Sequence, residues 1–184
     1  LSLSLIFCGA NIAFAEESGG FVGFGIGGGG TQWKASKGGE SGKVNYSGLN
    51  YGFVGGYKQF FTPYLGLRYY VNVDLHHNMS KVGDETKALK HIIANYGANV
   101  DFLGNFVSTE FVDFGGFVGV GIGANTLTGK DIEYMKTMYE NSGEKFNTTG
   151  FDVWLNVGLR TNIATNHGLE VAVRVPFLPV TMFN

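Results

Sequence analysis

The sequence predicts an all-β fold: a transmembrane, antiparallel, up-and-down β-barrel of eight strands, of which seven lie within this chain. Apolar and polar residues alternate with a period of two over segments about as long as a tilted membrane strand, which needs roughly 9–11 residues. The connections between these segments alternate between short and long, as they do at the two ends of an outer-membrane barrel. No run approaches the roughly 18 continuous apolar residues of a membrane-spanning helix, so any crossing of a membrane must use strands.

Residues 64–76 show the alternation most clearly, because apolar residues fall on one face of the predicted strand and polar residues and glycine on the other. The apolar positions are Leu65, Leu67, Tyr69, Val71, Val73 and Leu75. Four further segments repeat the pattern, at residues 48–58, 92–102, 151–160 and 169–175. Two glycine-rich segments, 22–27 and 114–123, complete the set of seven predicted strands.

The connections are predicted to place short turns on one side of the barrel and long, charged loops on the other. The short turns fall at residues 60–63, 103–111 and 164–168, and the long loops at Thr31–Tyr46, His77–Lys90 and Asn125–Gly150. If the first strand runs outward, every short turn is periplasmic. Single-chain bacterial barrels have even strand numbers, and a seven-stranded sheet would leave two unpaired edges in lipid. We therefore expect the eighth strand to follow Asn184.

The first 15 residues are predicted to be a secretory signal peptide. They are apolar and small, and they end in an Ala-Phe-Ala triplet at residues 13–15. Because the charged start is missing, the chain is expected to begin inside the signal, and the barrel domain, truncated at its C-terminus, to occupy residues 16–184. A lipoprotein signal around Cys8 is the alternative, although Phe7 is larger than the residue usual at that place. Cleavage after residue 15 would remove the only cysteine, and with it any thiol chemistry.

The polar face of the predicted strands is expected to point into the barrel. The apolar face is almost free of charge, whereas the other face combines charged residues, asparagine and many of the 30 glycines, which would cover the outside of a soluble sheet poorly. Aromatic residues near the short turns resemble an interfacial girdle: Tyr57, Phe60, Phe61, Tyr64, Phe102, Phe106 and Phe111. A soluble barrel with an apolar interior is the alternative.

Nine charged residues share the inward face. Toward the short turns, three cations face three anions, namely Lys58, Arg68 and Arg160 against Asp101, Asp113 and Glu170. Further out lie Asp74, Asp152 and Arg174. Buried charges need partners, and the interior of an eight-stranded barrel is just wide enough for side chains to fill. We therefore expect a paired charge network that plugs the lumen; the alternative is solvated side chains with loose partners.

Catalytic and metal-binding chemistry has little support. A set of polar residues at the outer strand ends could in principle carry out acyl transfer or lipid A deacylation: His76, His77 and His91, with Asp74, Ser80 and Asp84 nearby. No Gly-x-Ser-x-Gly motif accompanies them, and their spacing is not a recognised metal-ligand set. We therefore expect no enzyme activity, no metal and no cofactor. The net charge of −2 gives a nucleic-acid partner no electrostatic basis.

Six motifs recur in order along the chain after residue 15. They are GFVGFG at residues 20–25, GLRYY at 66–70, YGANVD at 96–101, GGFVG at 115–119, FDVWLNVGLR at 151–160 and HGLEV at 167–171. Together they resemble the Helicobacter outer-membrane protein family, the Hop-like adhesins and porins and their smaller relatives. The resemblance implies an outer-membrane barrel. The large adhesive domain of the long members is absent, since only Thr31–Tyr46 connect the first two strands, so no adhesin binding residue is carried over.

These observations predict an outer-membrane protein with a structural or surface-interaction role, related to that of the adhesins and carried by extracellular loops. The expected partners are outer-membrane lipid, the barrel-assembly machinery, and a host or surface ligand at residues 31–46, 77–90 or 125–150. A narrow, porin-like channel through the polar interior is the alternative function. A lipid-modifying enzyme of the outer membrane is the third.

Overall fold

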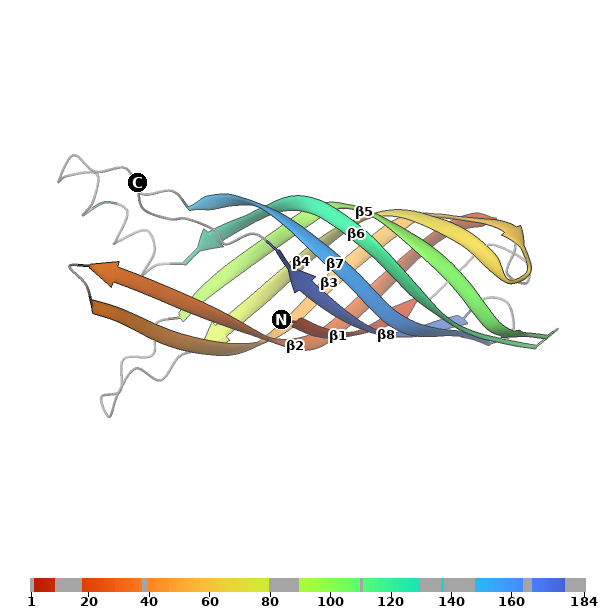
Figure 1. Ribbon diagram of the computed structural model, residues 1–184, viewed down its shortest axis with the longest axis horizontal. Coiled ribbons are helices and arrows are strands. Elements are labelled where there is room, and N and C mark those ends of the chain that lie inside the picture. The colour runs from red at the N-terminus through yellow and green to blue at the C-terminus, as the bar shows by residue number, and fades with distance from the viewer. Residues whose placement is uncertain are drawn as a thin grey trace.

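Eight antiparallel strands close into a barrel in the computed structural model, which describes residues 2–8, 18–37, 40–79, 90–109, 111–129, 137, 148–163 and 167–177 (Figure 1). The strands are β1 (Ser2–Cys8), β2 (Gly19–Lys37), β3 (Glu40–Thr62), β4 (Leu65–Met79), β5 (Lys90–Ser108), β6 (Val112–Thr128), β7 (Thr149–Ile163) and β8 (His167–Pro176). Each strand pairs with its neighbours in sequence, and β1 pairs with β8. The predicted up-and-down β-barrel is confirmed. Within the described part of the chain, no helix has the length and apolar character needed to cross a membrane.

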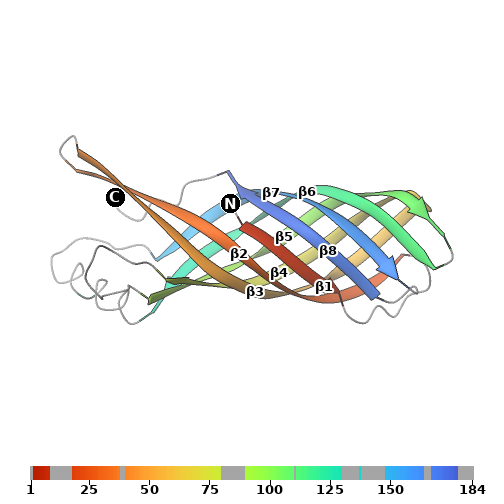
Figure 2. The same cartoon turned by 90° about the horizontal axis from the view of Figure 1, so that it is seen from below.

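β1 is the eighth strand of this barrel, and a strand that follows Asn184 stays a prediction. β1 lies between β2 and β8, where Leu5 pairs with Ile26 on one side and with Val171 on the other (Figure 2). Residues 1–5 alternate leucine with serine, so this segment has the period-two pattern of a barrel strand. Its pairing satisfies backbone groups at both edges of the seven-stranded sheet, which are costly to leave open in lipid. The signal peptide at residues 1–15 stays a prediction.

β2 and β3 continue beyond the barrel as a two-stranded hairpin, where we expected the loop Thr31–Tyr46 (Figure 2). The ladder between them runs without interruption to the pair of Lys37 and Glu40, so the prediction of a loop is wrong for this segment. The register places Trp33 opposite Val44, and aromatic and β-branched residues favour strands. Length and charge suggested a loop, whereas the backbone pairing of the two strands continues through this segment.

The other connections keep the predicted difference between the two ends of the barrel. β3 and β4 are joined by residues 63–64, and β5 and β6 by residues 109–111, at the end opposite the hairpin (Figure 1). The predicted loops at 77–90 and 125–150 are shortened, because β4 runs to Met79 and β6 to Thr128. Several connecting segments lie outside the described residues: 38–39, 80–89, 130–136, 138–147 and 164–166.

The two faces of the strands differ in exposure as the alternation predicts. Apolar side chains face outward along the barrel: Phe53 is 65% exposed, Val71 60% and Leu159 53%. Polar and charged side chains face inward, and Asp101 (0%) and Asn72 (1%) are fully buried. An apolar outer surface over a polar interior is the arrangement of a membrane barrel, and it is the reverse of a soluble one. The soluble alternative is therefore rejected.

The aromatic residues near the short turns also face outward, with one exception. Exposed rings at this end are Tyr57, Phe61, Tyr64, Phe102, Phe106 and Phe111. Phe60 instead packs inside the barrel against the cluster of Leu103, Phe117 and Ala172, so its placement in the girdle is wrong. Phe60 lies one residue from Phe61, and neighbours along a strand point to opposite faces.

The outer face supplies a first testable prediction. Val71→Arg places a charge on the exposed face of β4, and we expect it to lower the free energy of unfolding by about 2–4 kcal/mol, the cost of an arginine near the bilayer midplane. Urea unfolding in lipid vesicles measures the change. Val71→Leu, which keeps the position apolar, is the matched control and should stay within about 0.5 kcal/mol of the unchanged protein. Equal stability of the two variants would contradict the assignment of this face to lipid.

Candidate functional site

The barrel interior holds a buried ion-pair cluster centred on Arg68 of β4. Nη2 and Nε of Arg68 donate to Oδ2 of Asp101 on β5, at 2.6 and 3.2 Å. Nη1 donates to Oε1 of Glu170 on β8, at 2.6 Å. The three side chains are 3%, 0% and 2% exposed. A planar guanidinium presents several donors in fixed directions, which is why one arginine can hold two carboxylates here.

Three aromatic rings surround the Arg68 guanidinium and remove it from water. Its Cζ lies 4.5 Å from the ring centroid of Phe117, 4.9 Å from that of Tyr70 and 5.7 Å from that of Phe21. Cation–π attraction of this kind contributes most where the cation is desolvated. The rings and the ion pairs together fill this level of the lumen.

A second ion pair lies further toward the outer end. Nη1 of Arg174 on β8 donates to Oδ2 of Asp74 on β4 at 2.7 Å, and also to Oδ1 of Asn95 at 3.1 Å. The guanidinium lies over Trp154, with its Cζ 5.0 Å from the ring centroid. Arg174 and Asp74 are 19% and 17% exposed, so this ion pair is more accessible to water than the one between Arg68 and its two carboxylates.

Both ion pairs cross the lumen from one wall to the other. β4 and β8 are four strands apart in a closed ring of eight, so they face each other across the interior. The order of charges along β4 is the reverse of that along β8. On β4 the cation Arg68 lies nearer the short turns and the anion Asp74 nearer the outer end. On β8 the anion Glu170 lies nearer the short turns and the cation Arg174 nearer the outer end. A shift that brought Arg68 next to Arg174 would oppose like charges. The alternation of sign therefore favours one alignment of the two walls.

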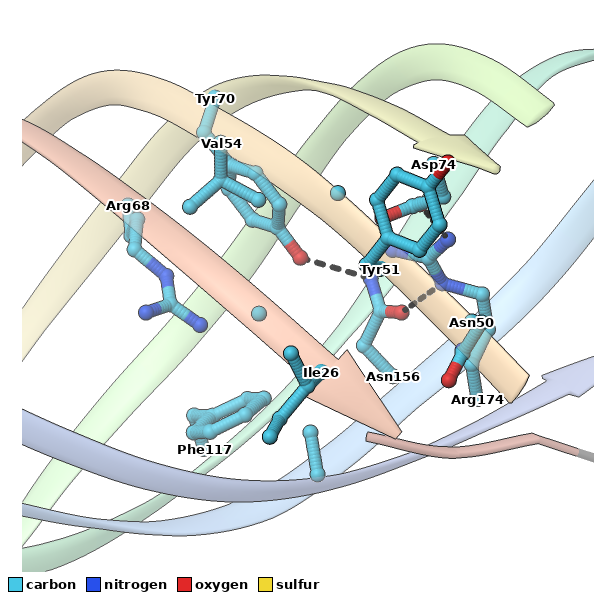
Figure 3. Close-up of a pocket in the computed structure, with 13 residues that line it drawn as sticks. Ile26, Asn50, Tyr51, Val54, Arg68, Tyr70, Asp74, Phe117, Asn156 and Arg174 are labelled. Atoms are coloured by element: carbon cyan, nitrogen blue, oxygen red, sulfur yellow. Dashed lines mark hydrogen bonds and ion pairs between the residues drawn. The ribbon is translucent and has the colours of Figure 1, made fainter. Parts of the chain in front are cut away.

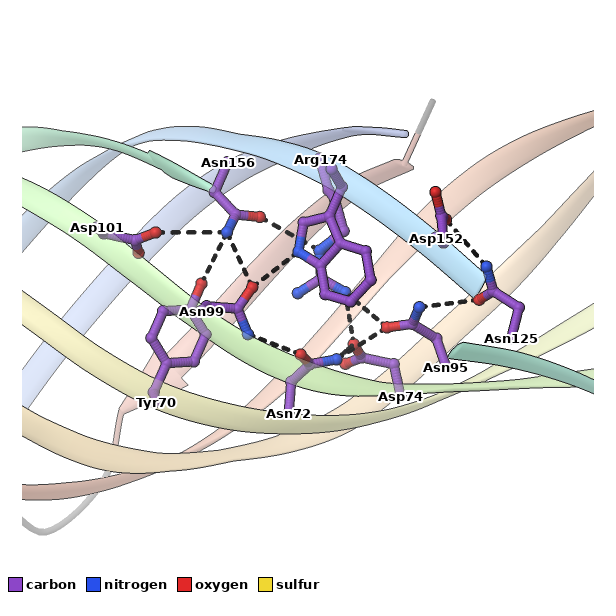
Figure 4. Close-up of polar contacts among 11 residues, drawn as sticks. Tyr70, Asn72, Asp74, Asn95, Asn99, Asp101, Asn125, Asp152, Asn156 and Arg174 are labelled. Carbon is purple, nitrogen blue, oxygen red and sulfur yellow. Dashed lines mark hydrogen bonds and ion pairs between the residues drawn. The ribbon is translucent and has the colours of Figure 1, made fainter. Parts of the chain in front are cut away.

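Asparagine side chains connect the two levels. Asn99 donates to Asn72 and Asn72 to Asp74, at 2.8 and 2.6 Å. Asn156 donates to Oδ1 of Asn99 at 3.0 Å and to Oδ1 of Asp101 at 3.3 Å (Figure 4). No role for these asparagines was predicted from the sequence. Their signal was available, since they occupy the same alternating inward positions as the charged residues.

Trp154 is fully buried in the lumen, in space that glycines leave open. Its Nε1 donates to Oδ1 of Asn99 at 2.7 Å. A Cβ at Gly123 would lie 2.8 Å from Cη2 of Trp154, closer than such atoms approach, and one at Gly121 would collide with Nε1. The glycines of β6 are therefore needed where a large ring packs against the wall.

The remaining predicted residues, Lys58, Arg160, Asp113 and Asp152, are also buried. Lys58 lies over the ring of Phe21, with its Nζ 5.3 Å from the ring centroid. Arg160 donates to Oδ1 of Asn105 at 3.2 Å.

The last two predicted anions accept hydrogen bonds from neutral side chains. Asp113 accepts one from Ser108 at 2.7 Å, and Asp152 accepts one from Asn125 at 2.9 Å. The structure thus gathers Arg68, Asp101 and Glu170 in one cluster. It places Asp74 and Arg174 in another, to which Asp152 connects through asparagines.

A small cavity of about 30 Å³ lies between the two ion pairs (Figure 3). Arg68, Tyr70, Asn156 and Arg174 line it on one side, and glycines of β2 and β3 line it on the other. A cavity of this size and polarity has room for about two water molecules.

Of the histidines at the outer strand ends, the structure describes the side chains of His76 and His77. His77 Nε2 lies 3.0 Å from the hydroxyl oxygen of Tyr51, and the two rings stack at 5.5 Å. His76 is the adjacent residue on β4 and therefore points to the opposite face. Ser80, Asp84 and the side chain of His91 lie outside the described part of the chain. No group of three or more His, Cys, Asp or Glu among the described residues could hold a metal ion.

Comparison with known proteins gives one match. The family model described as Helicobacter outer membrane protein matches residues 52–184, which is more than two thirds of the chain. Neither the search of curated proteins nor the search of solved structures found a match. The matched range contains β4 to β8 and most of the barrel part of β3, and thus every residue of the two ion-pair clusters. The chain therefore belongs to the Helicobacter outer membrane protein family.

Proposed function

We propose that this outer-membrane protein is a barrel with a closed lumen that serves a structural and surface-interaction role, related to that of the adhesins, at its outer end. The observation that supports this most is the filling of the interior by Arg68, its two carboxylates and its three aromatic neighbours. Such a lumen offers no wide aqueous path. The role then falls to the β2–β3 hairpin and to the loops within 77–90 and 125–150.

Conductance tests the closed lumen. Reconstituted in planar lipid bilayers, the protein is expected to give no steady open channel, because two levels of side chains block the interior. A protein denatured before reconstitution controls for leakage caused by the preparation. A stable, large conductance would contradict the proposal and favour a transport function.

Surface interaction is tested at the hairpin. The protein in lipid nanodiscs is compared with a variant in which residues 31–46 are replaced by an Asn-Gly turn, using binding to cultured epithelial cells. We expect the variant to bind at least about tenfold more weakly, a loss of roughly 1.4 kcal/mol in binding free energy, while its barrel stays folded. Equal binding by the two proteins, or no binding by the intact one, would contradict a ligand at the hairpin.

A narrow, porin-like channel is the second candidate. The polar cavity between the ion pairs favours it, because that cavity and the asparagines beside it form a hydrophilic interior above the Arg68 level. The conductance measurement above separates the two candidates.

We place no enzyme activity in the protein, and the proposal includes outer-membrane lipid and the barrel-assembly machinery as its partners. The third candidate, lipid modification, rests on the histidines at the outer strand ends. Mass spectrometry of lipid A from cells that produce the unchanged protein, or the His76→Ala and His91→Ala variants, tests it. A lipid A change that depends on either histidine would overturn the assignment as a non-enzyme.

A further inference from the structure

The cavity between the two ion pairs is lined by more cationic than anionic side chains. Arg68 and Arg174 both line it, and Asp74 is the single carboxylate among the described lining residues. The two carboxylates that bind Arg68, those of Asp101 and Glu170, are not part of this wall. Figure 3 shows Arg68 and Arg174 on opposite sides of the cavity. The wall therefore has an excess of positive charge.

Both guanidinium groups have hydrogen-bond donors left over. A guanidinium carries five N–H groups in fixed directions. Arg68 donates three hydrogen bonds, two to Asp101 and one to Glu170. Arg174 also donates three, one through Nε and two through Nη1, and none through Nη2. Within the described part of the chain, each arginine thus retains two N–H groups without an acceptor.

Tyr70 adds a fifth donor to the same space. Its hydroxyl oxygen accepts a hydrogen bond from Nδ2 of Asn156 at 3.1 Å, and its own hydrogen finds no acceptor among the described residues. The side chain is 8% exposed and lines the cavity. Buried donors are costly to leave without acceptors, so this space favours a ligand that accepts hydrogen bonds.

An ion that only accepts hydrogen bonds suits this wall better than water does. Each water molecule brings two hydrogens of its own, which need acceptors in turn. Oδ2 of Asp74 already accepts from Asn72 and Arg174. A halide ion donates nothing, accepts from several donors at once and offsets the excess positive charge. The cavity of about 30 Å³, which has room for about two water molecules, is also large enough for one chloride or bromide ion.

We propose that this cavity is a binding site for one chloride ion, held by Arg68, Arg174 and Tyr70. The ion enters from the outer end, where Arg174 and Asp74 are 19% and 17% exposed, whereas Arg68 is 3% exposed. The site goes beyond the proposed surface role, and one bound ion requires no open path through the barrel. Its absence would therefore leave that role untouched.

Dialysis against radioactive chloride tests the site in the full chain. The protein in lipid nanodiscs is expected to bind one chloride per barrel in a saturable way, at an ionic strength held constant with gluconate, which is too large for the cavity. Tyr70→Phe removes one donor with little change of shape, and we expect it to bind at least about tenfold more weakly. Tyr69→Phe is the matched control, because it makes the same change on the outer face, where Tyr69 is 40% exposed. It should bind as the unchanged protein does.

Bromide locates the ion directly. In crystals grown in bromide, anomalous diffraction is expected to give a peak between Arg68 and Arg174, and Arg174→Leu should remove it. No saturable binding by the unchanged protein, equal affinity in Tyr70→Phe, or an equal loss in Tyr69→Phe would each overturn the proposal. A bromide peak found only at the outer surface would overturn it as well.

Discussion

Arg68→Leu is expected to lower the free energy of unfolding by about 3–5 kcal/mol, the cost of leaving a buried charge without its partner. Asp101 and Glu170 are 0% and 2% exposed, and both accept hydrogen bonds from this arginine at 2.6 Å. Leucine fills part of the space but donates nothing, so both buried carboxylates lose the guanidinium that binds them. Urea unfolding in lipid vesicles, together with the heat-induced mobility shift on gels, measures the loss.

Two controls separate charge from packing at this site. Arg174→Leu removes the ion pair with Asp74, but these side chains are 19% and 17% exposed, so a much smaller loss, about 1 kcal/mol, is expected. Neutralising the whole cluster, as Arg68→Met with Asp101→Asn and Glu170→Gln, should recover most of the loss, because uncharged groups of similar shape replace buried ion pairs at little cost. A triple variant as unstable as Arg68→Leu would show that buried charge is not the cause.

Trp154→Ala is expected to destabilise the barrel by about 3–5 kcal/mol and to raise its conductance. The indole is fully buried, holds Asn99 through its Nε1 and supports the Arg174 guanidinium. Its removal leaves a void beside the existing cavity of about 30 Å³ and frees the outer ion pair to move. Vesicle unfolding measures the first effect and planar bilayer recording the second.

Trp154→Phe is the matched control for this variant. Phenylalanine keeps an aromatic ring over the glycines of β6 but loses the hydrogen bond to Asn99, so we expect a smaller loss, about 1–2 kcal/mol, and no added conductance. If Trp154→Ala stays as tightly closed to ions as the unchanged protein, the Arg68 level alone blocks the lumen. If the free energy of unfolding of Trp154→Ala also equals that of the unchanged protein, the indole ring does not have the packing role described above.

Much of the fold could be predicted from local pattern alone. Alternation within each strand assigns every residue to the lipid side or the lumen side, because neighbouring side chains must point to opposite faces. That rule places Phe53 on the lipid side and Asp101 on the lumen side, as the structure does. Phe60 was predicted from its position near a turn and not from this rule, and that prediction is wrong. The prediction of a loop at 31–46 is wrong because pairing between two strands depends on both of them, and β2 and β3 stay paired as far as Lys37 and Glu40.

The sequence by itself determined the barrel class, the inward set of charges and the side on which the short turns lie, since each depends only on the order and period of residues along one strand or between two. Only the tertiary structure decided which charges meet. Arg68 and Glu170 are 102 residues apart, and their contact depends on the register of every seam between β4 and β8. The closure by Ser2–Cys8 is of the same kind, because the position at which a strand joins a sheet is set by the free edges of its neighbours and not by the strand's own sequence.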